Sequence, residues 1–422
     1  MLIKNARFVI TPEQVMENVD ILIENDVITK IGKLSISEEN KIDARGKLVL
    51  PGLINTHTHA SMVLFRGAGD DMPLMEWLEK HIWPMESKLA ENDVYLGALL
   101  ACIEMIKSGT TSFCDMYFYM DGVAKAVKDA GIRAVLSWAV IDKEISTQPG
   151  DPVNNAEKFI KKWGGEERIY PSIGPHSIYT CSKETLLRSK EISDRYNVVN
   201  HIHLSETKNE IEGCVEKNKM RPAEYLNSIG FFSERTLAAH CVWLNEKEIS
   251  TLSKNKVSVS HCPVSNMKLA SGVMPFTKMQ RESVNISLGT DGAASNNSLD
   301  MFETMKLTAL LHKSKDMNAA VVKADDVLKC ATIGGAKALR LEKEIGSIEV
   351  GKKADLIILN VEKAHWKPTW NPISNLVYSA KSCDVETVIC NGKVIMQDRK
   401  ILTLNEEKIF EKVEKLKQKF KD

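Results

Sequence analysis

The two ends of the chain share a pattern of short runs in which apolar and polar residues alternate. These runs are residues 2–10, 19–33 and 41–52 near the start, and residues 354–360 and 385–400 near the end. Alternation of this kind predicts β-strands, and Asn391-Gly392 is a strong hairpin signal. We therefore expect residues 1–52 and 346–401 to form one small composite β-sandwich domain from both chain ends.

The middle of the chain has a different pattern, in which eight short apolar segments alternate with stretches of helical periodicity. The apolar segments are residues 52–59, 109–116, 132–140, 169–176, 198–206, 236–244, 257–263 and 285–292. Alternating strands and helices indicate a parallel sheet, and eight such units indicate a closed one. Residues 53–345 are therefore predicted to form an α/β fold, a (β/α)8 TIM-type barrel.

The last part of the chain, residues 402–422, is rich in charged residues and predicts a separate C-terminal helix. Its apolar side is expected to carry Ile409, Phe410, Val413 and Leu416. We interpret this helix as a packing element or as a contact between subunits.

Composition narrows the class of protein. Lysine and arginine equal aspartate and glutamate at 56 each, so no global field attracts nucleic acid or anionic lipid. No run reaches the roughly 18–20 apolar residues that cross a bilayer, and the first residues lack a signal-peptide layout. The nine cysteines are scattered and form no CxxC pair. We expect a reduced, cytoplasmic enzyme with no nucleic-acid or membrane partner.

Residues with catalytic potential fall at the carboxyl ends of the predicted barrel strands, where the active site of this fold lies. They are His57, His59, His203, Glu206, His240 and Asp291. Taken singly, each could equally be a rim or core residue, and Asp-Gly is often only a turn. In a closed barrel, however, the histidines of strands one and five meet the aspartate of strand eight. Three neutral nitrogens and one carboxylate suit Zn²⁺ or Fe²⁺ and leave a position for water, so the pattern predicts a metal site.

Several segments resemble the amidohydrolase superfamily. They are LVLPGLINTHTHASMVLFRG, HIHLSET, AAHCVWL, SHCPVSNMKLASG and SLGTDGAASNN. Within the superfamily, the chain is similar to the branch of 5-methylthioadenosine/S-adenosylhomocysteine deaminases, which includes 5′-deoxyadenosine deaminases. The resemblance covers essentially the whole chain, including the stretch IGSIEVGKKADLIIL near its end.

The resemblance implies that His57, His59, His203 and Asp291 bind one metal ion per subunit, which is zinc or ferrous iron. Binuclear relatives bridge two metal ions with a carboxylated lysine from the fourth strand. The corresponding residues 169–180 contain no lysine. This difference favours a single ion, which fits a deaminase better than a hydrolase of amide rings.

The reaction implied is hydrolytic deamination of adenine nucleosides derived from S-adenosylmethionine. The expected substrates are 5′-deoxyadenosine, 5′-methylthioadenosine, S-adenosylhomocysteine and adenosine, and the products are the inosine analogues and ammonia. A metal-bound hydroxide attacks C6 of adenine while Glu206 protonates N1 as general acid and base. Asp291 takes the proton from the attacking water, and His240 orients that water. Other zinc deaminases also use a glutamate that does not bind the metal.

The resemblance also implies a set of substrate contacts. These fall on Glu86, His176, Glu206 and Asp291. Glu86 corresponds to a glutamate that accepts hydrogen bonds from the ribose hydroxyls, although a glutamate after proline also suits the first turn of a helix. His176 corresponds to a histidine near the ribose and the 5′ group. We expect His201 to support its neighbours and His261 to brace the rim.

The segment after the third barrel strand departs from the family pattern. Members that accept the homocysteine carboxylate offer arginine there, whereas residues 137–151 contain Trp138 and Lys143 but no arginine. A bidentate guanidinium clamp on a carboxylate is therefore not evident. We expect the 5′ pocket to prefer small or apolar groups and to turn over S-adenosylhomocysteine less efficiently.

Three other functions are alternatives for this sequence. A deaminase or dechlorinase of guanine, cytosine or a triazine ring would use the same metal set, and only Glu86 and His176 argue against it. A non-catalytic scaffold would be expected to lose the ligands, yet all of them are present. A nucleic-acid editing enzyme would need a basic channel, which the balanced charge does not indicate. Because related enzymes commonly assemble, we expect a homo-oligomer, either a tetramer or a dimer.

Overall fold

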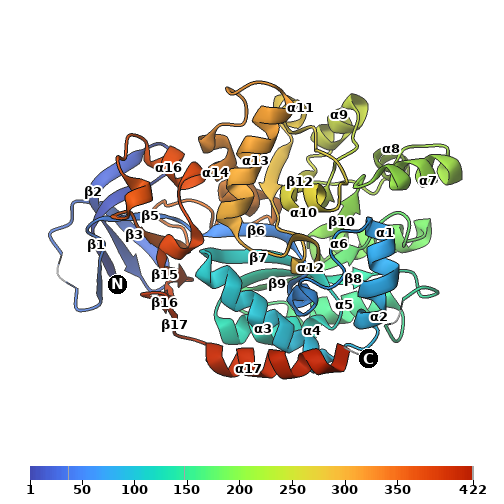
Figure 1. Cartoon of the computed structure of the whole chain (residues 1–422), viewed down its shortest axis with the longest axis horizontal. Helices are drawn as coiled ribbons and strands as arrows, with labels where there is room; N and C mark the ends of the chain where they lie inside the picture. Colours follow the sequence, from blue (N-terminus) through green and yellow to red (C-terminus); the bar gives the residue numbers. More distant parts are fainter. Residues whose placement is uncertain (37, 147, 421–422) are drawn as a thin grey trace.

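The computed structural model describes residues 1–36, 38–146 and 148–420, which form a barrel and a second sheet (Figure 1). The barrel has eight strands, and neighbouring strands along it are parallel. In order, they are β6 (Leu53–Thr58), β7 (Thr110–Tyr117), β8 (Arg133–Val140), β9 (Ile169–Pro175), β10 (Asn200–Leu204), β11 (Thr236–His240), β12 (Ser258–His261) and β13 (Asn285–Leu288). The first and last strands meet because Thr56 Oγ1 lies 2.8 Å from Ser287 Oγ and donates to the carbonyl of Leu288 at 2.9 Å. The predicted (β/α)8 barrel is confirmed.

Helices join these strands or follow the last of them, and they surround the barrel (Figure 1). They are α3 (Glu91–Lys107), α4 (Met120–Ala130), α5 (Pro152–Trp163), α6 (Lys183–Tyr196), α7 (Lys208–Asn218), α8 (Pro222–Ser228), α9 (Glu246–Lys254), α10 (Pro263–Lys268), α11 (Phe276–Arg281), α12 (Ala293–Asn296), α13 (Met301–Lys315), α14 (Ala324–Ala331) and α15 (Ile333–Ala338). Several begin where a short polar side chain accepts a first-turn N–H. These caps are Asp151 for α5, Ser182 for α6, Thr207 for α7, Asn245 for α9 and Asp300 for α13. Such residues satisfy donors that a helix start leaves unpaired, which explains where these helices begin.

The second sheet is built from both ends of the chain, as predicted. Its strands are β1 (Leu2–Ile10), β2 (Val15–Glu24), β3 (Val27–Gly32), β4 (Lys41–Asp43), β5 (Lys47–Pro51), β14 (Leu356–Asn360), β15 (Val385–Cys390), β16 (Lys393–Gln397) and β17 (Lys400–Ile401). They hydrogen-bond in the order β17-β16-β15-β14-β5-β1-β2-β3, with β4 beside β1. Successive residues of a strand face opposite sides. On β14, Ile358 therefore joins the core of this sheet, whereas Ile357 and Leu359 join the core shared with the barrel.

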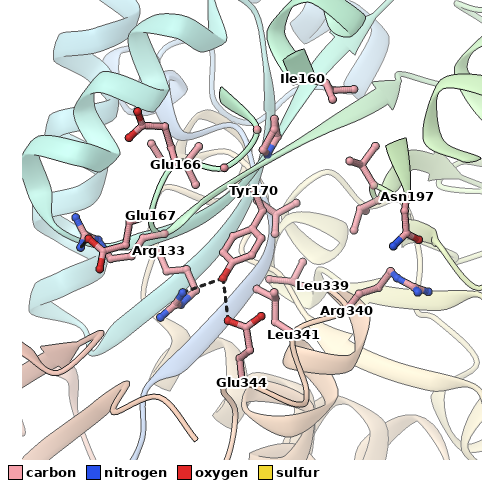
Figure 2. Close-up of a pocket in the computed structure, with 18 of the residues that line it drawn as sticks. Arg133, Ile160, Glu166, Glu167, Tyr170, Asn197, Leu339, Arg340, Leu341 and Glu344 are labelled. Carbon is pink, nitrogen blue, oxygen red and sulfur yellow. Dashed lines mark hydrogen bonds and ion pairs between the residues drawn. The ribbon is translucent and has the colours of Figure 1, made fainter. Parts of the chain in front are cut away.

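A buried ion pair joins the two sheets at the amino end of the barrel strands. Arg133, at the start of β8, donates through Nε and Nη2 to the two carboxylate oxygens of Asp355 at 2.9 and 3.0 Å. Both side chains are only 2% exposed. Arg133 Nη1 also donates to Tyr170 Oη, which in turn donates to Glu344 (Figure 2). A bidentate geometry of this kind is among the strongest of side-chain contacts.

A cavity of about 770 Å³ lies beside this ion pair, at the end of the barrel away from the predicted site (Figure 2). Its charged groups already have partners within the described chain. Lys353 pairs with Asp26, Arg168 with Glu167 and Arg340 with Glu234. The cavity therefore offers no unpaired cation that would attract a ligand.

The predicted terminal helix is present as α17 (Glu406–Leu416), which continues into the short helix η5 (Lys417–Phe420) and lies on α3. Residues 421 and 422 of the prediction lie outside the described residues. Ile409 is buried as expected. Phe410 is 43% exposed, so its predicted place on the buried apolar side of the helix is wrong. The ring of Phe420 packs edge-on against Phe65, with 5.3 Å between centroids. None of the described helices is long and apolar enough to span a membrane.

We expect Asp355→Asn to lower the free energy of unfolding by about 3–5 kcal/mol, because it leaves the Arg133 guanidinium buried without its counter-charge. Urea unfolding followed by circular dichroism measures this loss. Glu411→Gln removes a carboxylate from an exposed pair with Lys415 and should leave the unfolding midpoint unchanged. Equal effects of the two substitutions would contradict the assigned importance of the buried pair.

Candidate active site

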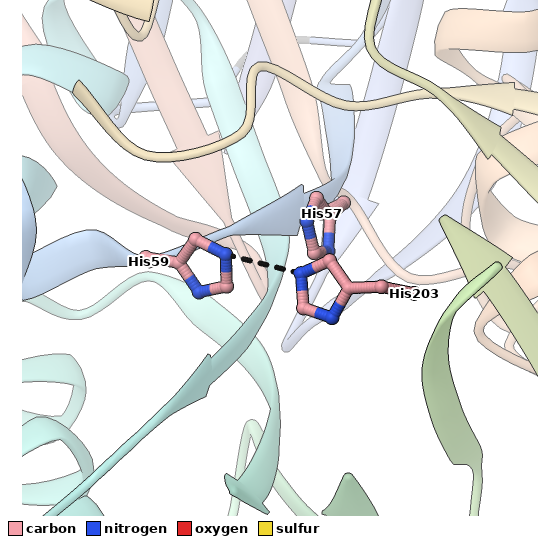
Figure 3. A group of neighbouring side chains, drawn as sticks. All are labelled: His57, His59 and His203. Carbon is pink, nitrogen blue, oxygen red and sulfur yellow. Dashed lines mark hydrogen bonds between the residues drawn. The ribbon is translucent and has the colours of Figure 1, made fainter. Parts of the chain in front are cut away.

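The predicted histidines and aspartate lie together at the carboxyl ends of the barrel strands. His57 on β6 and His59 just after it face His203 on β10 (Figure 3). Asp291 follows β13, and its Oδ1 lies 3.5 Å from His57 Nε2 and 3.3 Å from His59 Nε2. His59 and His203 approach each other through their Nε2 atoms at 3.3 Å. The ring nitrogens of His57, His59 and His203 lie within 4.8 Å of one another, as do the ligand atoms of His57, His240 and Asp291, so this His/Asp cluster could hold a metal ion.

Backbone carbonyls set the tautomers of two of these histidines. His59 Nδ1 lies 2.7 Å from the carbonyl oxygen of Met116, and His203 Nδ1 lies 2.8 Å from that of His176. A carbonyl only accepts, so in the neutral form of each ring Nδ1 carries the proton and Nε2 keeps its lone pair. Among the described residues, the buried Nε2 of His57 has no hydrogen-bond partner. Lone pairs aimed at one point and a buried nitrogen without a partner fit a bound metal ion.

The charges of the cluster are strongly coupled. Burial lowers the pKa of His57 to about 4 despite the opposing effect of Asp291, and burial holds the pKa of His203 well below its usual value. Burial also acts on His59, but the hydrogen bond and charge of Asp291 outweigh it and raise the pKa of His59 to about 9. For Asp291, burial is outweighed by the nearby rings of His57 and His59, which keep its pKa well below the usual range. A metal ion binding here therefore competes with a proton held between His59 and Asp291.

Two serines orient Asp291, and sequence reasoning missed both. Ser265 Oγ donates to Asp291 Oδ2 at 2.6 Å, and Ser295 Oγ donates to the same oxygen at 3.0 Å. This leaves Oδ1 facing His57 and His59. Ser295 lies four residues after Asp291, but Ser265 comes from α10 and could be found only in the folded chain.

Glu206 and His240 lie on the other side of the cluster. Glu206 Oε2 is 3.9 Å from His240 Nε2, and both side chains are more than nine-tenths buried. Burial raises the pKa of Glu206, partly opposed by the nearby His240. His240 Nδ1 lies 2.9 Å from Asn266 Oδ1, a contact that fixes the ring. The arrangement can present a proton-carrying carboxyl group and an imidazole to one ligand.

A cavity of about 650 Å³ opens from this cluster. Its outer part is covered by residues 74–86, which form α1 (Leu74–Trp77), η2 (Leu78–Ile82) and α2 (Trp83–Glu86); we call them the cover segment. The apolar part of its lining includes Leu74, Met75, Leu78, Trp83, Phe118, Ile141 and Ile145. No lysine or arginine of the described chain lines this cavity, whereas three acidic residues do: Glu86, Glu206 and Asp291.

Glu86 and His176 both line this cavity. Tyr117 Oη donates to Glu86 Oε1 at 2.7 Å, a partner that sequence reasoning did not identify. Burial outweighs this bond and raises the pKa of Glu86 to about 7. His176 Nδ1 lies 3.0 Å from Thr180 Oγ1, and burial lowers the pKa of His176 to about 3. Both residues therefore offer largely desolvated polar groups to a ligand.

The segment after the third barrel strand was predicted to matter through Trp138 and Lys143, but other residues of it line the cavity. Trp138 packs against Phe159, with 5.8 Å between ring centroids, and Lys143 is exposed; neither lines the cavity. Ile141 and Ile145 of the same segment do line it. Ser146 is the polar residue of this segment in the lining, so the wall at this point is mainly apolar.

His201 and His261, which were predicted to have only supporting roles, each contact another buried histidine. His201 Nε2 lies 2.8 Å from His57 Nδ1 and supports that ring. His261 Nε2 lies 3.0 Å from Nε2 of His312 on α13, and both rings are buried. His261 does not line the cavity, so it braces the barrel against an outer helix.

Comparison with known proteins places the chain in a family. A model of the Amidohydrolase family matches residues 48–395. The chain is 49% identical to a 5′-deoxyadenosine deaminase of Methanocaldococcus jannaschii over 94% of this chain and 95% of that protein. It is 47% identical to a 5-methylthioadenosine/S-adenosylhomocysteine deaminase of Thermoanaerobacter pseudethanolicus, over 98% of each.

A solved structure agrees with these relatives. The crystal structure of an adenosine deaminase from Xanthomonas campestris with bound zinc superposes with a TM-score of 0.97 at 33% identity. The match covers 99% of this chain and 98% of that one. Since the family model and these relatives span most of its length, the chain belongs to the amidohydrolase family.

Proposed function

We propose that this protein hydrolytically deaminates adenine nucleosides derived from S-adenosylmethionine. The observation that carries the proposal is the meeting of the His/Asp cluster, Glu206 and Glu86 in one cavity whose described lining has no lysine or arginine. The relatives described above are named as deaminases of 5′-deoxyadenosine, 5′-methylthioadenosine, S-adenosylhomocysteine and adenosine. The products would be the corresponding inosine analogues and ammonia.

We assign one metal ion, zinc, to His57, His59, His203 and Asp291. The donor set of three neutral nitrogens and one carboxylate supports this assignment, and the Xanthomonas relative carries zinc. Ferrous iron suits the same donors, and metal analysis of the purified protein distinguishes the two ions. When bound, such an ion lowers the pKa of a coordinated water to about 7 and supplies the nucleophile.

The protons are then moved by residues of the chain. Glu206, whose pKa is raised by burial, donates a proton to N1 of adenine, which lets C6 accept the attacking oxygen. Asp291 accepts a proton from the attacking water, and His240 orients that water by a hydrogen bond. Asp291 then passes its proton to the exocyclic nitrogen, ammonia leaves as the C6–N bond breaks, and the proton of the C6 hydroxyl returns to Glu206 as the carbonyl forms.

The sugar is assigned to Glu86 and His176. Glu86 would accept hydrogen bonds from the ribose hydroxyls, and Tyr117 would hold its carboxylate in place for that purpose. His176 would lie beside the ribose and the 5′ group. The apolar wall of Ile141, Ile145 and the cover segment would then receive the 5′ substituent. A homo-oligomeric state, a cytoplasmic location and the lack of nucleic-acid or membrane partners stay predictions.

The zinc-loaded protein is expected to convert 5′-deoxyadenosine, 5′-methylthioadenosine and adenosine, seen as the adenine-to-hypoxanthine change in absorbance. Glu206→Gln should lower kcat by about 10²–10⁴-fold, because general acid–base catalysis contributes that much. Its zinc content should equal that of the wild type. Turnover of guanine, cytosine or a triazine with no activity on adenine nucleosides would overturn the proposed substrate class but leave a metal-dependent hydrolase.

The 5′ preference is tested by ranking kcat/KM values. Neutral 5′-deoxyadenosine and 5′-methylthioadenosine should exceed S-adenosylhomocysteine and adenosine 5′-monophosphate, because no lysine or arginine of the described chain lines the cavity to meet a carboxylate or phosphate. Ile145→Arg should improve the ratio for S-adenosylhomocysteine over 5′-methylthioadenosine by about tenfold, the effect of one charge-assisted hydrogen bond. Ile145→Gln is the matched uncharged control and should leave the ratio unchanged. Equal ratios in all three proteins would contradict this reading of the wall.

His201→Gln should weaken zinc binding by about 10–100-fold, because it disturbs the ring that holds His57 Nδ1. Competition with a fluorescent chelator measures the affinity directly. His312→Gln changes another buried histidine away from the cavity and should bind zinc as the wild type does. The same affinity in both variants would remove His201 from the support of the site.

A further inference from the structure

Glu210 is a buried carboxylate that the mechanism above does not use. It lies in the first turn of α7 and is 7% exposed. Its Oε1 accepts the N–H of Ser205 and its Oε2 accepts the N–H of Glu206, each at 2.8 Å. No ion pair to Glu210 is formed within the described part of the chain. Burying a carboxylate without a cation is costly, so its two backbone bonds must account for its place.

These bonds differ from those of an ordinary helix start. Thr207 caps α7, and its Oγ1 accepts the N–H of Glu210 at 3.2 Å. A glutamate at this third position of a helix usually reaches back to the N–H of the cap residue itself. Glu210 instead passes over Thr207 and binds the two N–H groups before it. The carboxylate therefore holds the segment between β10 and α7 rather than the helix end.

That segment is under conformational constraint. Ser205 has a φ of 52°, in the left-handed region that costs a residue other than glycine on the order of 1–3 kcal/mol. Its carbonyl accepts the N–H of Trp243 at 2.9 Å, and the carbonyl of Leu204 accepts that of Cys241 at 2.9 Å. These bonds tie the segment to the one that follows His240. Glu210 thus fixes one side of a peptide whose other side is tied to the neighbouring strand end.

The orientation of the Glu206 side chain depends on this peptide. Its carboxylate lies 3.9 Å from His240 Nε2, which is beyond hydrogen-bonding distance. Apart from a contact with Ser271, the side chain is therefore directed by the backbone that carries it. A shift of about 1 Å in a reacting group can cost as much as a hundredfold in rate.

We propose that Glu210 is a positioning residue for Glu206: its carboxylate fixes the Ser205 and Glu206 N–H groups and so directs the Glu206 side chain into the cavity. This inference rests on the proposed role of Glu206 as the proton carrier. Glu210 itself touches neither substrate nor metal ligand in this arrangement. Its effect on the reaction passes through Glu206 alone.

The test is a double-mutant cycle on kcat with zinc-loaded, full-length protein. In Glu210→Gln one amide oxygen accepts one N–H, while the amide NH₂ faces the other N–H and repels it. We expect kcat for 5′-deoxyadenosine to fall about 10- to 100-fold, with KM within about threefold and zinc content unchanged. In a Glu206→Gln background the same substitution should cost less than about threefold, because its target is already gone.

Glu212→Gln is the matched control, because Glu212 is an exposed carboxylate on the same helix and should retain wild-type kcat. A kcat of Glu210→Gln within twofold of the wild type, or losses that multiply in the double variant, would overturn the positioning role. If Glu210→Gln does not fold, Glu210→Asp, which keeps the charge but is too short for both bonds, is judged by the same cycle. If the wild type acts on another ring instead of adenine, the proposed substrate fails, and the cycle on that ring still decides the role of Glu210.

Discussion

Closure of the barrel between its first and last strands is the constraint on which the site depends. The seam is held by polar side chains: Asn55 Nδ2 donates to Thr290 Oγ1 at 2.7 Å, and Asn55 Oδ1 accepts the Thr290 N–H at 3.0 Å. Beside them, the N–H of Asp291 donates to the carbonyl of His57 at 2.9 Å. Each of these groups is buried, and leaving one unpaired costs about 1–3 kcal/mol. A shifted register would break several at once, so the bonds that close the barrel also hold His57 and Asp291 opposite each other.

The cavity combines a coordinated cluster with an acidic and apolar wall. Backbone carbonyls fix the ring nitrogens of His59 and His203, so the cluster is prepared before any ligand arrives. Burial raises the pKa of Glu86 and Glu206 despite the opposing effect of nearby histidines, and no lysine or arginine belongs to the described lining. Such a site suits a neutral molecule with several hydrogen-bond donors and an apolar end, and it disfavours anions. A nucleoside with a short 5′ substituent has these properties.

The sequence predicts the strands, the sheet built from both ends and the histidines at the strand ends, because these follow from periodicity and from the geometry of a closed barrel. The roles of Glu86 and His176 came from resemblance alone, since neither lies in a pattern that physical reasoning interprets. Ser265, Tyr117 and Glu210 were missed because each acts on a residue that is distant in the chain or through backbone N–H groups that no pattern reveals. Phe410 was misplaced because helical periodicity does not say how far a neighbouring surface extends.

The pairing of β5 with β14 has a consequence for synthesis on the ribosome. Leu48 of β5 pairs with Leu359 of β14, so the strand partner emerges about 300 residues later. At translation rates of about 5–20 residues per second, the β14-facing edge of β5 waits roughly 15–60 s for that partner. The whole barrel is made in this interval, and an unpaired apolar strand edge is a site where other chains attach. The barrel must therefore fold beside an unfinished sheet, and a nascent chain that stalls before residue 356 would expose that edge to aggregation.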